Sequence, residues 1–168
     1  MSYTSHFLHA DEIIAHLNTI IPTITDDLLK AKYVGFVAVA SATVYEVAIK
    51  DIFISFAKSE HNILGNLMAS KFERINGKID IETIKNDYIK PLGADYLDRF
   101  KVNLELSNNA FLQINRRDFK SSYKNLILTR HQFAHVGQLL GNSTYPEIVQ
   151  AYEDGKEVIK CLSETMLA

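Results

Sequence analysis

Residues 33–57 read YVGFVAVASATVYEVAIKDIFISFA and form the most hydrophobic stretch of this 168-residue chain. Apolar side chains fall on nearly every side of a helix drawn through it, and only Glu46, Lys50 and Asp51 carry charge. The uninterrupted apolar part is too short for a membrane span of roughly 20 residues. A helix that is apolar all round is normally buried by other helices. The stretch therefore predicts the central helix of a bundle and no membrane partner.

The pattern around this stretch places the ends of the central helix. Thr25 or Asp26 can cap its start, and it is expected to run to about Ser59. Alanines at 38, 40, 42 and 48 would let neighbouring helices approach closely. Its core-facing residues are expected to include Leu28, Phe36, Val37, Ala40, Val44, Val47, Ile52 and Phe56.

Other helical segments are expected on both sides, separated by turn signals at Asn76-Gly77, at Pro91-Leu92-Gly93, and at Gly137, Gly141 and Asn142-Ser143-Thr144. They cover residues 11–21, 62–74, 81–89, 94–114, 121–137 and 144–168. Asp11 is expected to cap the first of these segments and Ser121 or Ser122 the fifth, and the last segment is expected to start near Thr144. No strand pattern lasts more than a few residues. The fold class predicted is all-α, a single-domain bundle of five to seven helices over residues 11–168, preceded by a loose arm at residues 1–10.

The bulk composition excludes some classes of function. The net charge is −2, so a nucleic-acid partner must be held by a local patch rather than by an overall basic field. The single cysteine, Cys161, excludes an internal disulfide and a cysteine-based metal cage. The absence of a signal-peptide pattern at the start and the scarcity of cysteine favour a cytoplasmic location.

Residues 126–137, LILTRHQFAHVG, concentrate polar chemistry in a mostly apolar helix. His131 and His135 are one turn apart and share a face. Arg130 lies between Leu126 and Ala134, toward the packed side, where a guanidinium needs an acidic or phosphate partner. Arginine grips phosphate with two parallel hydrogen bonds, and histidine can move a proton near neutral pH.

The run Arg130-His131-Gln132-Phe133-Ala134-His135 resembles the Arg, four-to-six residues, His signature of the HEPN superfamily. In that family the position after the arginine is usually Asn, Asp or His, and His131 satisfies this. The order of helices is similar too, with a long helix that carries Glu46 and a final helix after a glycine-containing loop. The RiboL-PSP-like group of HEPN domains is the nearest in character.

The resemblance implies a metal-independent endoribonuclease that needs no cofactor and acts as a homodimer, with two motifs in one cleft. His135 would act as general base on the 2′-hydroxyl, and Arg130 would bind the scissile phosphate. His131 would orient the phosphate or transfer a second proton, and Glu46 would hold Arg130 or a histidine in place. RNA products would end in 2′,3′-cyclic phosphate. Such domains act as toxins or antiviral effectors, often beside an antitoxin protein.

Structural interpretations of the same residues stay open. Arg130 could be a buried arginine paired with Glu46, and Glu46 with Lys50 fits a plain helical salt bridge. His131 could be a helix-end histidine that favours the carbonyl terminus, and His135 an interface histidine. The domain could then be a non-catalytic, dimeric HEPN-like module that binds a nucleotide, an RNA or a protein.

A metal site is a further alternative, because His131 and His135 have the i, i+4 spacing of two zinc ligands. Gln132 stands where the catalytic glutamate of such a motif is expected, so the metal reading is disfavoured. N-terminal histidines could supply a third ligand only by folding back: His6, His9 and His16.

The only dense basic cluster lies just before the motif. It consists of Arg116, Arg117, Lys120 and Lys124. A solvated surface is the default interpretation of such a cluster. If RNA binds, these side chains are where phosphate contacts are expected. Tyr123 beside them could stack on a base, although a core tyrosine is favoured.

Overall fold

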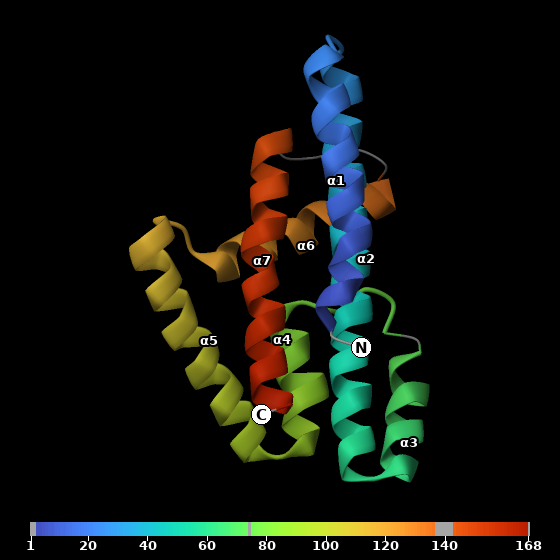
Figure 1. The fold of residues 1–168 in the computed structure, drawn as a ribbon, viewed down its shortest axis with the longest axis vertical. Coiled ribbons are helices and arrows are strands. Elements are labelled where there is room, and N and C mark those ends of the chain that lie inside the picture. Colours follow the sequence, from blue (N-terminus) through green and yellow to red (C-terminus); the bar gives the residue numbers. More distant parts are fainter. Residues whose placement is uncertain (1–2, 74, 137–142, 168) are drawn as a thin grey trace.

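The computed structural model describes residues 3–73, 75–136 and 143–167, and these form helices and turns without a strand (Figure 1). The helices are α1 (Leu8–Ile20), α2 (Asp27–Glu60), α3 (Asn62–Phe72), α4 (Ile81–Thr83), α5 (Ala94–Asn115), α6 (Phe119–Val136) and α7 (Tyr145–Met166). The predicted all-α bundle is confirmed. The loop predicted at Gly137, Gly141 and Asn142 lies outside the described residues.

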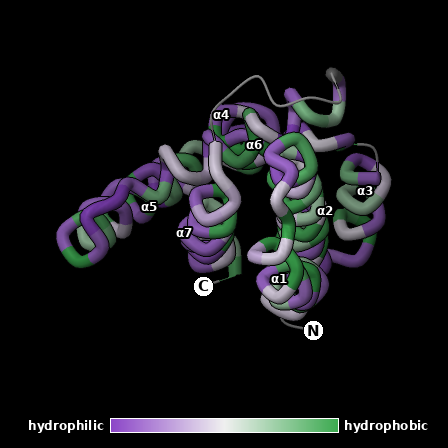
Figure 2. The backbone as a smooth tube through the Cα atoms, turned by 90° about the horizontal axis from the view of Figure 1, so that it is seen from above, coloured by the Kyte–Doolittle hydropathy of each residue, from purple (hydrophilic) through white to green (hydrophobic). Residues whose placement is uncertain are grey.

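Helix α2 is the centre of the bundle, as its composition predicts. It packs against α1, α3, α6 and α7, and Figure 2 shows it end-on between α7 and α3. The Asp26 side chain begins the helix by accepting hydrogen bonds from the amides of Leu28 and Leu29. Ala38 and Ala48 are fully buried where neighbouring helices approach. In the part of the chain that is described, no helix has both the length and the apolar character needed to cross a membrane.

Three residues of α2 that were expected in the core are exposed instead. Leu28 is 67% exposed, Phe36 47% and Val47 41%. The helix is apolar on almost every side, but its neighbours leave part of its circumference and its first turns uncovered. Periodicity cannot choose the buried side when all sides are apolar. Burial is confirmed for four others: Val37, Val44, Ile52 and Phe56.

The hydroxyl of Ser41 is a weak point in the core of α2. The side chain is fully buried, and its oxygen has no hydrogen-bond partner among the described residues. A buried, unpaired hydroxyl costs about 1–3 kcal/mol. Ser41→Ala is therefore expected to raise the free energy of unfolding in urea by about 1 kcal/mol. Ser59→Ala, which removes a hydrogen bond to the Phe56 carbonyl, should not stabilise, and a less stable Ser41→Ala protein would contradict the expectation.

The expected loose arm is wrong for residues 3–10. Tyr3–Phe7 forms a 3-10 turn, and helix α1 already begins at Leu8. The Phe7 ring is buried and meets the Tyr45 ring edge-to-face at 5.8 Å between centroids. The Tyr152 hydroxyl also donates to the Phe7 carbonyl at 3.2 Å, so tertiary contacts fix a segment whose composition is typical of a tail.

Asp11 does not cap α1 as expected. It lies inside the first turn, and its carboxylate accepts hydrogen bonds from the Tyr152 hydroxyl (2.8 Å) and from Lys156 Nζ (2.9 Å). Both partners lie on α7, so Asp11 ties the first helix to the last. Its partners are far away in the sequence, and local spacing could not reveal them.

The ends of the last two helices are fixed by side chains. Asp118 caps α6, since its Oδ1 accepts from the Ser121 amide at 2.8 Å. The prediction that Ser121 or Ser122 caps this helix is thus off by three or four residues. Helix α7 starts next to Thr144 as predicted, and the structure shows that Thr144 caps it in a reciprocal capping box with Glu147.

The segment between α3 and α5 is less regular than the single helix predicted at 81–89. After the short helix α4, residues Ile84–Ile89 form a π-helical turn and Lys90–Leu92 a 3-10 turn. Gly93 then ends the segment with a φ of 140°, a conformation open only to glycine. The helical character is confirmed, but the hydrogen-bonding pattern changes twice.

Helix α5 leans away from the bundle and is largely hydrophilic (Figures 1 and 2). Ser107-Asn108-Asn109 does not break it, because Asn108 is buried and has partners. The side-chain Nδ2 of Asn108 donates to Asp118 Oδ2 at 3.1 Å, and its side-chain Oδ1 accepts from the backbone amide of Lys120 at 3.4 Å. Asn108 therefore fastens α5 to the start of α6.

Three buried tyrosines mark the place where α2, α6 and α7 cross. The Tyr45 ring stacks on Tyr123 and on Tyr152, each at 5.6 Å between centroids. Gly155 of α7 faces the same place. An ideal Cβ there would lie 2.8 Å from the Tyr45 hydroxyl and 3.2 Å from Tyr123 Cδ2. The three helices can approach this closely because position 155 has no side chain.

Candidate functional site

The two histidines of α6 form an exposed pair on the surface of the described chain. His131 and His135 are both solvent-exposed, and their ring centroids are 4.3 Å apart with a tilt of 57°. They share a face, as their spacing predicts. Two imidazoles at this distance can reach the same small group, such as one phosphodiester.

Arg130 points to a different side of the helix and is half-buried. Its guanidinium lies directly against the backbone of Gly77. An ideal Cβ on Gly77 would be 1.9 Å from Arg130 Nη2 and 2.4 Å from Cζ. No ion pair joins Arg130 to an acidic residue that the structure describes. The charge therefore remains available to an anion.

Arg130 rests on a turn formed by residues 75–79, here called the Gly77 turn. Asn76 and Gly77 both have positive φ, 47° and 74°, so the turn predicted from the Asn-Gly pair is confirmed. The Lys78 carbonyl accepts from the Tyr88 hydroxyl, and the Ile79 carbonyl accepts from the Tyr123 hydroxyl, each at 2.6 Å. Two tyrosines from different elements thus hold the turn in place.

Phe133 anchors the motif from the other side. Its ring lies on Gly35 of α2, where an ideal Cβ would come within 2.1 Å of the ring carbon Cδ2. Arg130 and Phe133 are three residues apart on α6 and each covers a glycine. With these two side chains packed inward, the rest of the motif turn is directed to solvent.

Glu46 on α2 is paired with Lys50, one turn later, at 2.8 Å between Oε1 and Nζ. No ion pair in the described structure joins Glu46 to the polar residues of the motif. Burial, with smaller contributions from nearby carboxylates that include Glu46, raises the pKa of Tyr88 to about 12. The role of Glu46 in holding the site stays a prediction.

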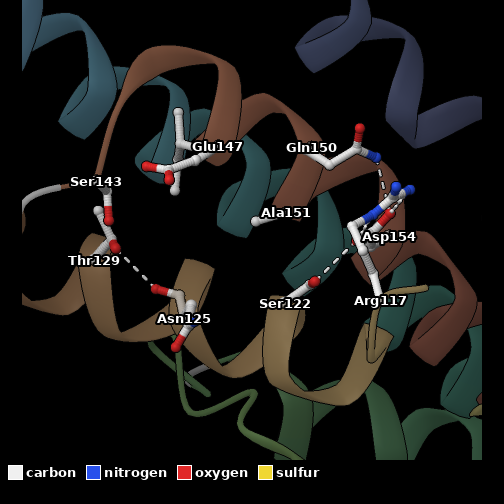
Figure 3. Close-up of a pocket in the computed structure, with 10 residues that line it drawn as sticks. Arg117, Ser122, Asn125, Thr129, Ser143, Glu147, Gln150, Ala151 and Asp154 are labelled. Carbon is white, nitrogen blue, oxygen red and sulfur yellow. Dashed lines mark hydrogen bonds and ion pairs between the residues drawn. The ribbon is translucent and has the colours of Figure 1, made fainter. Parts of the chain in front are cut away.

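Two side chains of the predicted basic cluster form ion pairs, and the other two form none with a described residue. Arg117 donates from Nε and Nη2 to the two carboxylate oxygens of Asp154, at 3.0 and 3.1 Å (Figure 3). Lys120 pairs with Glu105 at 2.7 Å. Lys124 makes no ion pair with a described residue and is exposed, like Arg116.

Asp154 was not indicated by the sequence and is the most heavily bonded carboxylate of the described chain. It is buried on α7 and accepts hydrogen bonds from Arg117, Ser122 and Gln150, which converge on it in Figure 3. The hydrogen bonds to Asp154 raise the pKa of Arg117. An arginine that was predicted to bind RNA thus has a structural partner.

A polar pocket of about 440 Å³ opens between α6 and α7 beside this ion pair (Figure 3). Asn125 and Thr129 line it from α6. At about 100° per residue, Asn125 is roughly 120° around the helix from His131, as Thr129 is from His135. The pocket therefore lies on a different side of α6 from the histidine pair.

The zinc alternative gains no third ligand. Within residues 3–73, 75–136 and 143–167, no group of three His, Cys, Asp or Glu side chains is arranged to hold a metal ion. His6 is instead hydrogen-bonded to Asp51 at 3.3 Å. Cys161 and Tyr123 are both buried, as expected for core residues.

The sequence model of a family described as RiboL-PSP-HEPN matches residues 5–168. The matched range runs through every described helix from α1 to α7. Among curated proteins and among solved structures, no match to the chain was found. The family match thus covers nearly the whole chain.

Proposed function

The chain belongs to the RiboL-PSP-HEPN family, and from this membership we propose that it is a metal-independent endoribonuclease. The family supports a role that involves RNA or nucleotides. The observation that carries the proposal is the motif turn itself. It presents two adjacent, exposed imidazoles. Directly before them in the chain comes Arg130, which has no described acidic partner.

In the proposed reaction the RNA 2′-oxygen attacks the adjacent phosphorus and the bond to the 5′-oxygen breaks. His135 accepts the proton of the 2′-hydroxyl, and His131 delivers a proton to the leaving 5′-oxygen or orients the phosphate. Arg130 binds the phosphate and stabilises the charge that develops on it. The products are a 2′,3′-cyclic phosphate and a 5′-hydroxyl. The step consumes no cofactor.

The substrate is held, in this proposal, by cations that form no ion pair with another described residue. Lys124 lies seven residues before His131, which places both on one side of α6. Lys124 and Arg116 are thus the preferred phosphate contacts. Arg117 and Lys120 contribute less, because Asp154 and Glu105 already bind them. Glu46 is assigned a supporting role because it lies on α2, which packs against the helix that carries the motif.

The active form is proposed to be a homodimer. Both histidines lie open on one surface of the single chain, and among the described residues no segment covers a phosphodiester bound there. A second copy facing the motif would supply the other wall of a cleft. Leu128, which is 51% exposed, lies on the same side of α6 as the histidine pair. As a cytoplasmic toxin or antiviral effector, such a dimer would be restrained by an antitoxin protein.

The decisive experiment is incubation of the purified protein with total RNA in EDTA, followed by analysis of the RNA ends. Cleavage is expected to persist in EDTA and to leave 2′,3′-cyclic phosphates, because the proposed chemistry uses side chains alone. Loss of cleavage on chelation would instead favour a metal-dependent enzyme.

A non-catalytic, dimeric binding module is the second candidate. The observation that favours it is the separation of Arg130 from the histidine pair around α6 in the single chain. If the folded, dimeric protein left RNA intact with and without EDTA, this candidate would replace the nuclease. Titration with RNA and with mononucleotides would then identify what the module binds.

A further inference from the structure

The contact between Arg130 and Gly77 joins two segments that are remote in the sequence. The guanidinium, the most mobile part of a long side chain, lies where any side chain at position 77 would have to be. Fixing such a side chain costs conformational entropy, so something in the structure must hold it. No described carboxylate does so.

The surface under the guanidinium is itself fixed from several sides. Ile75 and Ile79 are buried at the two ends of the Gly77 turn. Tyr88 holds the Lys78 carbonyl from the π-helical turn that follows α4. Tyr123 holds the Ile79 carbonyl from α6 itself.

Helix α6 contacts the Gly77 turn at two points on one face. Tyr123 and Arg130 are seven residues apart, which is close to two helical turns. The tyrosine bonds the end of the turn and the arginine covers its centre. The turn and α6 therefore form one unit, and the position of the guanidinium follows from it.

We infer that the Gly77 turn positions Arg130 for phosphate binding, and that Gly77 is a positioning residue of the proposed nuclease site. This inference rests on the proposed function. A carboxylate in the same place would also hold the arginine, but it would compete with the phosphate for the same hydrogen bonds. A glycine surface fixes the guanidinium and leaves its charge and its donors to the substrate.

The direct test is Gly77→Ala, with Gly93→Ala as matched control. Both glycines have positive φ, 74° and 140°, so both substitutions strain the backbone. Only the alanine at 77 would collide with Arg130, because the nearest atom to an ideal Cβ at 93 is Tyr96 Cδ2 at 3.8 Å. Gly77→Ala is expected to lower kcat by about 10- to 100-fold, and Gly93→Ala to change it less than about twofold.

A second readout is independent of activity. The Nε–H signal of Arg130 in a ¹⁵N NMR spectrum, assigned by its loss in Arg130→Lys, reports whether the guanidinium is fixed. It is expected at a distinct position in wild type and in Gly93→Ala, and at the free-arginine position in Gly77→Ala. If the wild-type protein does not cleave RNA, this spectrum still decides the positioning and separates it from the function.

Tyr88→Phe is the substitute test of the inference if the Gly77→Ala protein does not fold. It removes the hydrogen bond to the Lys78 carbonyl and leaves Arg130 and Gly77 unchanged. We expect a partial shift of the Arg130 signal toward the free position and a smaller fall in kcat than for Gly77→Ala. An Arg130 signal and a kcat equal to wild type in a folded Gly77→Ala or Tyr88→Phe protein would overturn the inference.

Discussion

Replacement of His135 by alanine is expected to lower the rate of RNA cleavage by about 100-fold or more, because a positioned general base contributes that much. Arg130→Ala is expected to cost about 100- to 1,000-fold, since it removes the charge that stabilises the phosphate in the transition state. Arg130→Lys keeps the charge but loses the two-pronged geometry, so it should recover only part of the rate. Cleavage of a defined RNA under single-turnover conditions measures all three.

His16→Ala is the matched control for His135→Ala. His16 is an exposed histidine on α1, so its loss removes an imidazole of similar exposure without touching the motif. Its rate should equal that of wild type. Equal rates for His135→Ala and His16→Ala, in folded and dimeric proteins, would remove His135 from the mechanism and leave the binding module as the better description.

Gly155→Val is expected to be the most destabilising single change in the core, lowering the free energy of unfolding by about 3 kcal/mol. The new Cβ would lie 2.8 Å from the Tyr45 hydroxyl, and the two methyl groups beyond it have no free space. Tyr45 cannot move aside easily, since it is fully buried and its hydroxyl donates to the Tyr152 carbonyl. Guanidinium chloride denaturation monitored by circular dichroism measures the loss.

Lys160→Val separates crowding from helix propensity. Position 160 is exposed on the same helix, so valine there adds the cost of a β-branched residue, about 0.5 kcal/mol. It also removes a surface ion pair with Glu157, which contributes little to stability. A much larger loss at 155 than at 160 is the expected result. Comparable losses would mean that α7 can shift away from Tyr45 and that the close approach is not essential.

The architecture was predictable because it follows from local patterns. The all-round apolar character of α2 indicated its central place, and the starts of α2 near Asp26 and of α7 near Thr144 were predicted within a residue. The shared face of His131 and His135 is a direct consequence of helix geometry. These features depend on residues a few positions apart, which a single sequence displays.

Pairings between distant residues could not be predicted in the same way. Arg117 looked like an RNA ligand because its partner, Asp154, lies 37 positions away on another helix. The Asn76-Gly77 pair indicated a turn, but nothing in the sequence connected that turn with Arg130. Phe7 was assigned to a loose arm for the same reason. In each case the local pattern indicated a property of the residue, and only the tertiary structure showed which distant residue it contacts.

The glycines under Phe133 and Arg130 offer a criterion for comparing relatives of this domain. Gly35 and Gly77 each leave a space that a motif side chain occupies. A relative could keep the arginine and the histidine and still lose the arrangement through a larger residue at either position. Such a chain would contain the signature letters without the geometry. Requiring glycine at both positions as well as the motif should therefore separate relatives that keep this arrangement from relatives that have lost it better than the motif alone.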